Sequence, residues 1–265
     1  MYLSLNKFLC TAVTFLACSG LVCAQQALKL PAYQKTKLPN GFTIILMQQT
    51  EVPLVSFHIG IRAGAINDPS GKEGAASVTA ELLRKGTKTR TSEQLSSELD
   101  FVGGRLSFDA EADLVRGQAE FLKKDVSLGL DLLADVLQSP TFPQAEVEKL
   151  LAQRIDGIKQ AKDQAEAVIQ NYFNAYLYGS HLYGRPDDGD EKSLAAIRRA
   201  DVVSFYEKNY GPDAITIAVV GDFDPAAMLR ALQSKFGTWQ KKGTANPVNP
   251  AAPVAYQGKK LLLVD

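Results

Sequence analysis

The sequence predicts an α+β domain in which helices pack against an antiparallel sheet. Segments with strand character come in consecutive pairs, and runs of helical segments follow them, without the regular alternation of a parallel α/β fold. The chain has 265 residues, of which 46% are hydrophobic and 22% charged, so it can bury a full core. Its 29 basic and 29 acidic residues give no net charge, which argues against nucleic acid or an anionic membrane surface as a partner.

Residues 1–24 have the pattern of a secretory signal peptide. Lys7 supplies a positive charge, residues 8–21 are apolar, and Val22-Cys23-Ala24 gives the small residues of a cleavage site. We expect cleavage near Ala24 and a periplasmic or secreted protein. No later segment reaches the ~20 apolar residues that a membrane-spanning helix requires, so we expect no membrane span.

Metal-binding and nucleophilic side chains are scarce in the rest of the chain. All three cysteines lie in the signal segment, so the mature protein would have no disulfide and no thiolate ligand. Lipid attachment at Cys18 is the alternative for that segment. The two histidines, His58 and His181, lie on different elements without the spacing of a metal site, and we expect structural roles for both.

The first elements are two strands and two helices. Asn40-Gly41 predicts a turn before a strand over 42–47. The strand over 55–62 alternates large apolar side chains with small or polar ones. A helix over 75–85 should end at Gly86, and Thr91 with Gln94 has the spacing of a capping box that starts the next helix.

The later elements follow from the same signals. The predicted strands are 105–108 and 114–121, and the predicted helices are 128–137, 144–164, 165–178 and 193–210. A strand over 214–220 leads into a helix with Asp224 as N-cap, Pro225 as first helical residue and Phe236-Gly237 as its end. Residues 241–257 have the composition of a linker, and 260–264 look like the start of another strand.

A set of short motifs carries a family resemblance. In chain order they are Leu38-Pro39-Asn40-Gly41, Arg62-Ala63-Gly64, Gly71-Lys72-Glu73-Gly74, Lys85-Gly86-Thr87, Gly103-Gly104, Tyr183-Gly184-Arg185-Pro186 and Val220-Gly221-Asp222-Phe223. Their order and spacing closely resemble the insulinase/pitrilysin family of zinc peptidases, from about Lys37 to Trp239. The resemblance implies a metallopeptidase half-domain like that of the mitochondrial processing peptidase. It assigns 25–240 to a first half-domain and 241–265 to a linker and the start of a second.

The zinc motif of the family is degenerate in this chain. Active members carry H-x-x-E-H on a helix and a distant glutamate as a further ligand. The ungapped match over 74–87 places Ser77 and Glu81 at the histidines, Ala80 at the general base and Gly157 at the distant glutamate. A catalytic zinc generally has three protein ligands, and a general base is worth ~10²–10⁴ in rate. We therefore predict no metal ligand, no bound cofactor and no catalytic residue at these positions.

Structural roles are the expected use of the degenerate positions. Ser77 and Ala80 should simply pack against their neighbours, and Glu81 should be solvated or salt-bridged. Gly157, in the middle of a helix, is expected to allow close helix packing because glycine there costs about 1 kcal/mol relative to alanine.

Peptide binding is the function that the resemblance implies for the sheet. In this family a peptide adds as an extra strand to a sheet edge, which needs no metal. The matching strand is Arg105-Leu106-Ser107-Phe108-Asp109, although it departs from the family's Asn-Ala-x-Thr pattern and the edge could be covered.

Three functional hypotheses result. The first is a noncatalytic subunit that binds peptides or unfolded polypeptides and pairs, as a hetero-oligomer, with a zinc-bearing relative in the periplasm. The second is a zinc-dependent metalloendopeptidase whose site is completed by unrecognised carboxylates or by another chain. The third is a free-standing periplasmic peptide-binding module or a gene fragment.

Overall fold

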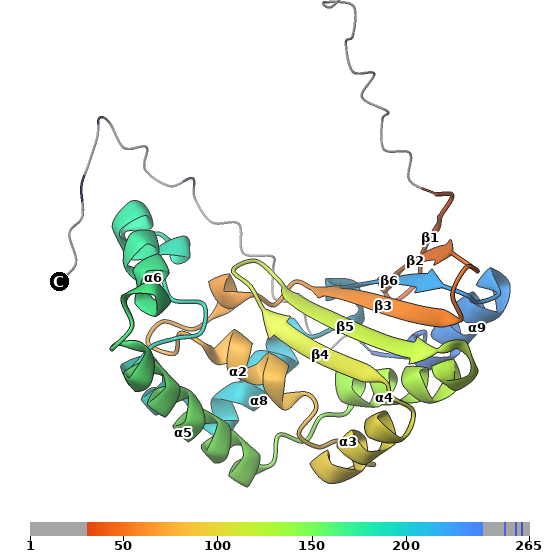
Figure 1. Ribbon diagram of the computed structural model, residues 1–265, viewed down its shortest axis with the longest axis horizontal. Helices are drawn as coiled ribbons and strands as arrows, with labels where there is room; N and C mark the ends of the chain where they lie inside the picture. Colours follow the sequence, from red (N-terminus) through yellow and green to blue (C-terminus); the bar gives the residue numbers. More distant parts are fainter. Residues whose placement is uncertain (1–30, 241–251, 253–257, 259–260, 262–265) are drawn as a thin grey trace, which may run out of the picture. The chain divides into compact units, whose positions relative to one another are not determined.

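The core of the fold is a six-stranded sheet with the strand order β1-β2-β6-β3-β5-β4 (Figure 1). The computed structural model describes residues 31–240, 252, 258 and 261. Its strands are β1 (Gln34–Lys37), β2 (Thr43–Gln48), β3 (Leu54–Ile61), β4 (Arg105–Ala110), β5 (Val115–Leu122) and β6 (Ile215–Gly221). Together with the helices below, this arrangement confirms the α+β class.

One strand pair differs from the antiparallel sheet that the sequence predicts. β2 and β6 pair in parallel, whereas the other neighbouring strands pair antiparallel. β6 returns from far along the chain and inserts between β2 and β3, which are consecutive in sequence. Because β6 runs antiparallel to β3, it lies parallel to β2. β1 was not predicted, since its polar side chains are mostly exposed and show no apolar alternation.

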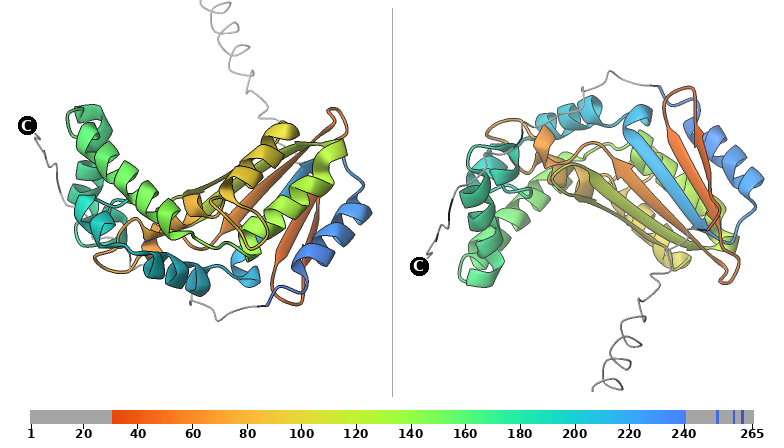
Figure 2. Two further views of the ribbon diagram at one scale, coloured as in Figure 1. Left: turned by 90° about the horizontal axis from the view of Figure 1, so that it is seen from below. Right: turned by 90° about the horizontal axis from the view of Figure 1, so that it is seen from above.

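The helices divide between one face of the sheet and the region beyond β4. They are α2 (Ala75–Leu82), α3 (Ser92–Phe101), α4 (Val126–Gln138), α5 (Gln144–Ala161), α6 (Ala165–Tyr178), α7 (Glu191–Ala196), α8 (Arg199–Asn209) and α9 (Pro225–Phe236). Figure 2 shows α3, α4 and α9 against one face of the sheet, while the other face is open. α2 contacts β4, α5 and α8, so it lies where the edge of the sheet meets the helices.

Strand alternation builds the core. Val55, Phe57, Ile59 and Ile61 of β3 are buried on one face, and β6 buries every second residue in the same way. Two aromatic contacts fix α9 and β5 to this layer. Phe42 stacks on Phe236 with ring centroids 4.7 Å apart, and Phe57 meets Phe121 edge to face at 6.4 Å.

Two helix ends follow the predicted caps, and two predicted boundaries are wrong. α2 ends at Leu82, where a turn follows, and not at the predicted Gly86. Thr91 and Gln94 form the capping box of α3, and the Asp224 side chain accepts from the Ala227 amide at the start of α9. The predicted helix over 193–210 is instead two helices, α7 and α8. The break comes at Arg198, which is extended and donates its amide to the Asp201 side chain at 2.8 Å, a capping interaction that starts α8.

Some predicted segments lie outside the described residues. The signal peptide over 1–24 is among them, as are most of the linker and strand predicted over 241–265. Within the described part of the chain, no helix combines the length and the apolar character that crossing a bilayer demands.

Candidate functional site

The N-terminus of α2 is fixed by two loops that pack on it. Asp68 is 6% exposed, and its carboxylate accepts from the amides of Gly74 and Ala76, each at 2.7 Å. Burial raises the pKa of Asp68 to about 7, although these two amides partly oppose that shift. Gly74 has φ 93°, and a Cβ there would lie 2.6 Å from the Asp188 carbonyl oxygen. The close approach of the two backbones therefore sets Asp188 beside α2.

The guanidinium of Arg154 lies at the centre of a polar cluster that joins α2, α5 and the loop after α6. Its Nη1 donates to Ser77 Oγ at 2.7 Å, and its Nη2 donates to Glu81 Oε2 at 2.8 Å. Ser77 Oγ in turn donates to Asp188 Oδ1 at 2.6 Å. The same Asp188 oxygen is 3.4 Å from Arg154 Nη1. We call Ser77, Glu81, Arg154 and Asp188 the arginine cluster.

The degenerate positions on α2 are thus used in three ways. Glu81 is salt-bridged, which confirms its predicted structural role. Ala80 is fully buried in the core, as expected of a packing residue. Ser77 is buried too, but the prediction that it simply packs is wrong, because its hydroxyl both accepts from Arg154 and donates to Asp188. Sequence reasoning missed this role because both partners are far away in the chain.

The prediction that Gly157 allows close helix packing is also wrong. Gly157 is exposed, and a Cβ built on it meets nothing within 4 Å. The face of α5 that packs into the core carries Val147, Leu150 and Leu151 instead. Gly157 follows Arg154 by three residues, about one helical turn, so a side chain at 157 would project from the face that carries the arginine.

The donor set at this place does not fit a zinc ion. Among the described residues, no group of three or more His, Cys, Asp or Glu side chains is placed to hold a metal. The groups at the degenerate positions are a hydroxyl and one carboxylate, and both are bound to the Arg154 guanidinium. A dication would meet that positive charge at short range. His58 is exposed on β3, and His181 accepts from the Tyr183 amide, so neither joins this cluster.

β4 is an edge strand of the sheet, as peptide addition requires. In the β4–β5 hairpin, the Glu111 amide donates to the Leu114 carbonyl. Every second residue of β4, counted back from Glu111, therefore forms backbone hydrogen bonds with β5. Arg105, Ser107 and Asp109 therefore bond to β5. The amides and carbonyls of the residues between and after them, Leu106, Phe108 and Ala110, point to the open side.

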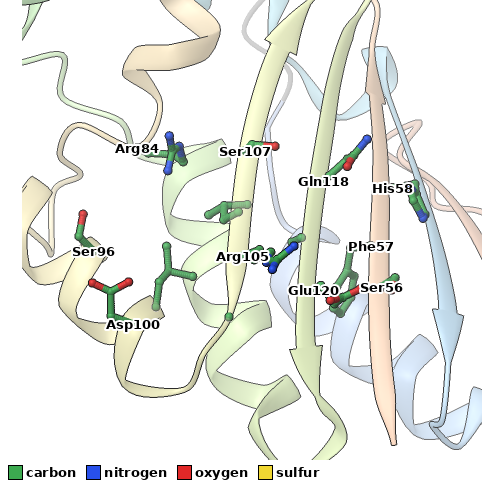
Figure 3. A pocket seen from close by; sticks show the side chains of 14 residues that line it. Ser56, Phe57, His58, Arg84, Ser96, Asp100, Arg105, Ser107, Gln118 and Glu120 are labelled. Atoms are coloured by element: carbon green, nitrogen blue, oxygen red, sulfur yellow. Dashed lines mark hydrogen bonds between the residues drawn. The ribbon is translucent and has the colours of Figure 1, made fainter. Parts of the chain in front are cut away.

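Two cavities adjoin this open side. The α2 cavity, about 420 Å³, lies between β4 and the arginine cluster and includes Ser107, Phe108, Asp109 and Ala110. The α3 cavity, about 440 Å³, includes Ser96, Leu99 and Asp100 of α3 with Arg105 of β4 (Figure 3). Arg84 and Ser107 line both cavities. We call the two cavities together the edge groove. It shows that the open side of β4 is accessible.

Sequence reasoning missed Arg84, Arg154 and Asp188. One signal was available for Arg154, because helical spacing places it one turn before Gly157. Asp188 belongs to a loop with several carboxylates. There, burial first and then the nearby charge of Asp188 raise the pKa of Asp187. Nothing local in the sequence connects that loop to α2.

Comparison with family models identifies two matches. Residues 43–186 match the model of the insulinase family, described as peptidase family M16, which covers more than half of the chain. Residues 196–265 match the model described as the peptidase M16 inactive domain. The point of division lies within one fold, because β6 belongs to the second match and pairs with β2 and β3 of the first.

Relatives and solved structures agree with these matches. An uncharacterized zinc protease from Mycobacterium leprae is 29% identical over 204 residues, which are 77% of this chain and 46% of the relative. The crystal structure of a peptidase M16 inactive domain from Pseudomonas fluorescens superposes with a TM-score of 0.77 at 24% identity, over 84% of this chain and 55% of that one. The first half of the periplasmic protease PqqL from Escherichia coli gives 0.74 at 18% identity, over 83% and 49%. The chain spans about half the length of the curated relatives it matches.

Proposed function

Since the chain belongs to the insulinase family of peptidases, peptidase family M16, we propose that it is a noncatalytic member that binds extended peptides and pairs with a zinc-bearing relative. The observation that carries the proposal is the arginine cluster. A guanidinium binds the side chains of Ser77 and Glu81, the two positions that match the family's metal-binding histidines. A side-chain cation thus links the elements that a metal would otherwise link.

The side chains at positions 80 and 157 support a binding role, because neither can take part in zinc-dependent hydrolysis. Ala80 matches the family's general base and carries no proton acceptor, and its side chain is fully buried. Gly157, at the match to the distant glutamate, has no side chain to offer. The zinc-dependent alternative would need ligands from elsewhere, and it would also need Arg154 to leave Ser77 and Glu81.

Peptide binding rests on the free edge of β4. The outward amides and carbonyls of Leu106, Phe108 and Ala110 offer a ladder to an added strand, and the edge groove gives it room. Leu106 and Phe108 are buried in the core through their side chains, which holds the edge rigid. The edge of β4 itself therefore recognises the backbone of an extended polypeptide.

Pairing rests on an apolar stripe of α6. Ile169, Tyr172 and Phe173 are 51%, 49% and 49% exposed and have the spacing of one helical face. The helix projects beyond α5 (Figure 1). An exposed apolar stripe of this kind is typical of a protein–protein interface. We propose that a zinc-bearing relative covers it, since the chain spans about half of its relatives. With the signal peptide predicted over 1–24, this pairing would take place in the periplasm.

Two matched variants test peptide binding at the edge. Ala110→Pro removes an outward amide without removing a bond to β5, while Ala110→Val keeps the amide. Fluorescence anisotropy with a labelled extended peptide of about ten residues should show binding by the natural protein and Ala110→Val, and weaker binding by Ala110→Pro. Equal affinities of all three proteins would sink the edge as the binding site.

Co-expression tests pairing. The natural protein and the zinc-bearing relative should elute together in size-exclusion chromatography, and Ile169→Lys with Phe173→Lys should separate them. Asp156→Lys with Lys159→Glu is the control, because it changes charge on an exposed part of α5. Peptide cleavage by the purified protein alone, sensitive to a chelator and accompanied by stoichiometric zinc, would contradict the noncatalytic assignment.

A further inference from the structure

Within the part of the chain that the structure describes, the guanidinium of Arg84 has no hydrogen-bond or ion-pair partner. Arg84 is half-buried in the turn that follows α2, and its Nε lies out of reach of water without a hydrogen-bond acceptor. Among the described residues it forms no ion pair. A buried donor without an acceptor is unfavourable, and more so when it carries a charge. The fold therefore holds a cation at the edge groove whose hydrogen-bonding capacity is unused.

Helix geometry explains why Arg84 faces the groove. It follows Ser77 and Glu81 by seven and three residues, so the three positions share one face of α2 and its last turn. All three line the α2 cavity opposite Ser107 and the rest of β4. Figure 3 shows Arg84 on the side of β4 away from β5, where an added strand would lie.

The two cavities are lined by the carboxylates of Glu81, Asp100, Asp109, Glu120 and Asp188, and none of these five pairs with Arg84. Glu81 and Asp188 of the α2 cavity are bound to Arg154. In the α3 cavity, Asp100 lies on α3 and Glu120 on β5 accepts from the Ser56 hydroxyl at 3.3 Å. Neither carboxylate forms an ion pair with Arg84 (Figure 3). Arg154 thus binds Glu81 and Asp188, and the guanidinium of Arg84 is left to bind a ligand.

We propose that Arg84 binds a carboxylate of the peptide, so that the edge groove selects acidic peptides. A guanidinium presents five donors in a fork that matches a carboxylate in two parallel hydrogen bonds. The position of Arg84 at both cavities allows this contact while the peptide backbone pairs with β4. This inference rests on the proposed peptide binding and adds the chemical class of the ligand. The carboxylate comes from an Asp or Glu side chain or from a peptide C-terminus.

A charge swap between protein and peptide tests the inference. The probes are fluorescein-labelled, amidated peptides of about ten residues built on a Ser-Val-Thr repeat, with a single Glu or Gln at each position in turn. A third series without Glu carries a free C-terminal carboxylate. The full-length natural protein is compared with Arg84→Gln and with Arg230→Gln, an exposed arginine on α9 outside the groove. Circular dichroism and urea unfolding check that each variant is folded.

The expected result is a preference of about tenfold for the peptide with Glu over its Gln partner at one register. Arg84→Gln should abolish that preference while it binds the Gln peptide as the natural protein does, and Arg230→Gln should keep it. A preference for the free C-terminal carboxylate alone assigns the site to peptide ends, and a preference for internal Glu assigns it to acidic side chains.

Two results overturn the inference, and they are distinguishable. If peptides bind but Glu and Gln are equivalent, or if Arg84→Gln keeps the preference, acidic selection is wrong while peptide binding stands. If no peptide binds, the proposed function and this inference fail together. As a second variant, Arg84→Glu should shift the preference towards peptides with Lys, an outcome that loss of folding would not produce.

Discussion

Arg154 of α5 and Glu81 of α2 are 73 residues apart in the chain and are joined by a hydrogen-bonded ion pair, with Nη2 2.8 Å from Oε2. The arginine side chain is 21% exposed and the glutamate 36%. The same guanidinium holds Ser77. The contact therefore fixes α5 to α2 at the two positions that the family resemblance matches to zinc-binding histidines.

Removing that guanidinium should destabilise the fold. Arg154→Met keeps the apolar stem but leaves Glu81 and the buried Ser77 hydroxyl without this donor, so we expect a loss of about 1–3 kcal/mol. Arg154→Lys should recover part of it, because an ammonium keeps the charge but not the fork. Urea unfolding measures both, with Arg230→Met as an exposed control. A loss no larger than that of the control would mean that the cluster adds nothing to stability.

Rebuilding the family motif should restore zinc binding only if Arg154 is removed as well. The variant Ser77→His, Glu81→His and Gly157→Glu supplies the three ligands, and position 157 has room for a side chain. With Arg154 retained, its charge competes with the metal.

We expect about one zinc per chain when Arg154→Met is added and much less without it, by elemental analysis after dialysis. An equal zinc content in the two proteins would show that Arg154 does not prevent zinc from binding. The natural protein, dialysed in parallel, gives the baseline.

Gly157→Ala should stabilise the protein. The position is helical and exposed, with no atom within 4 Å of the new methyl group, so alanine only lowers the entropy of the unfolded chain. The expected gain is about 0.5–1 kcal/mol in urea unfolding. Destabilisation would mean that another surface covers Gly157 in solution, which size-exclusion chromatography would detect.

Gly74→Ala should destabilise the protein. Gly74 has φ 93°, and its Cβ would press on the Asp188 carbonyl at 2.6 Å. We expect a loss of about 1–3 kcal/mol, since a left-handed residue and a backbone clash act together. Gly71→Ala is the matched control, because φ there is 78° but nothing lies within 4 Å. Similar losses for both variants would show that the contact with Asp188 is unimportant.

Asp68 should make stability fall as the pH rises from about 4 to 7. Burial raises its pKa from the ordinary value of 3.8 to about 7, so within this window the folded protein holds a proton that the unfolded chain has released. The contribution is therefore fully present below pH 4 and is lost as the pH rises through 7, at up to about 1.4 kcal/mol per pH unit.

The difference in unfolding free energy between the natural protein and Asp68→Asn isolates this effect, because asparagine does not titrate. The difference should decrease from pH 4 to pH 7 and then stay constant. A difference that stays constant from pH 4 to 7, and that instead increases as the pH rises towards 4, would mean that the amides of Gly74 and Ala76 outweigh burial and lower the pKa.

Much of the fold could be predicted from the sequence because the signals are local. The alternation in β3, the capping box of Thr91 with Gln94, and the Asp224 and Pro225 start of α9 each depend on residues within one turn or strand. The ordered motifs predicted the family, and the ungapped match over 74–87 located the degenerate metal positions. Where local signals were weak, as for polar β1 or the break at Arg198, the prediction missed an element or a boundary.

The sequence by itself determined that a serine, an alanine and a glutamate stand where the family resemblance predicts the zinc motif, and these residues are not the family's ligand set. Only the tertiary structure decided what replaced it. Arg154 meets Ser77 across 77 residues of chain, and Asp188 comes from a third segment. Among the residues that the structure describes, Arg84 has no such partner. These contacts depend on how α2, α5 and the loop around Asp188 pack, and periodicity within one element carries no information about its distant neighbours.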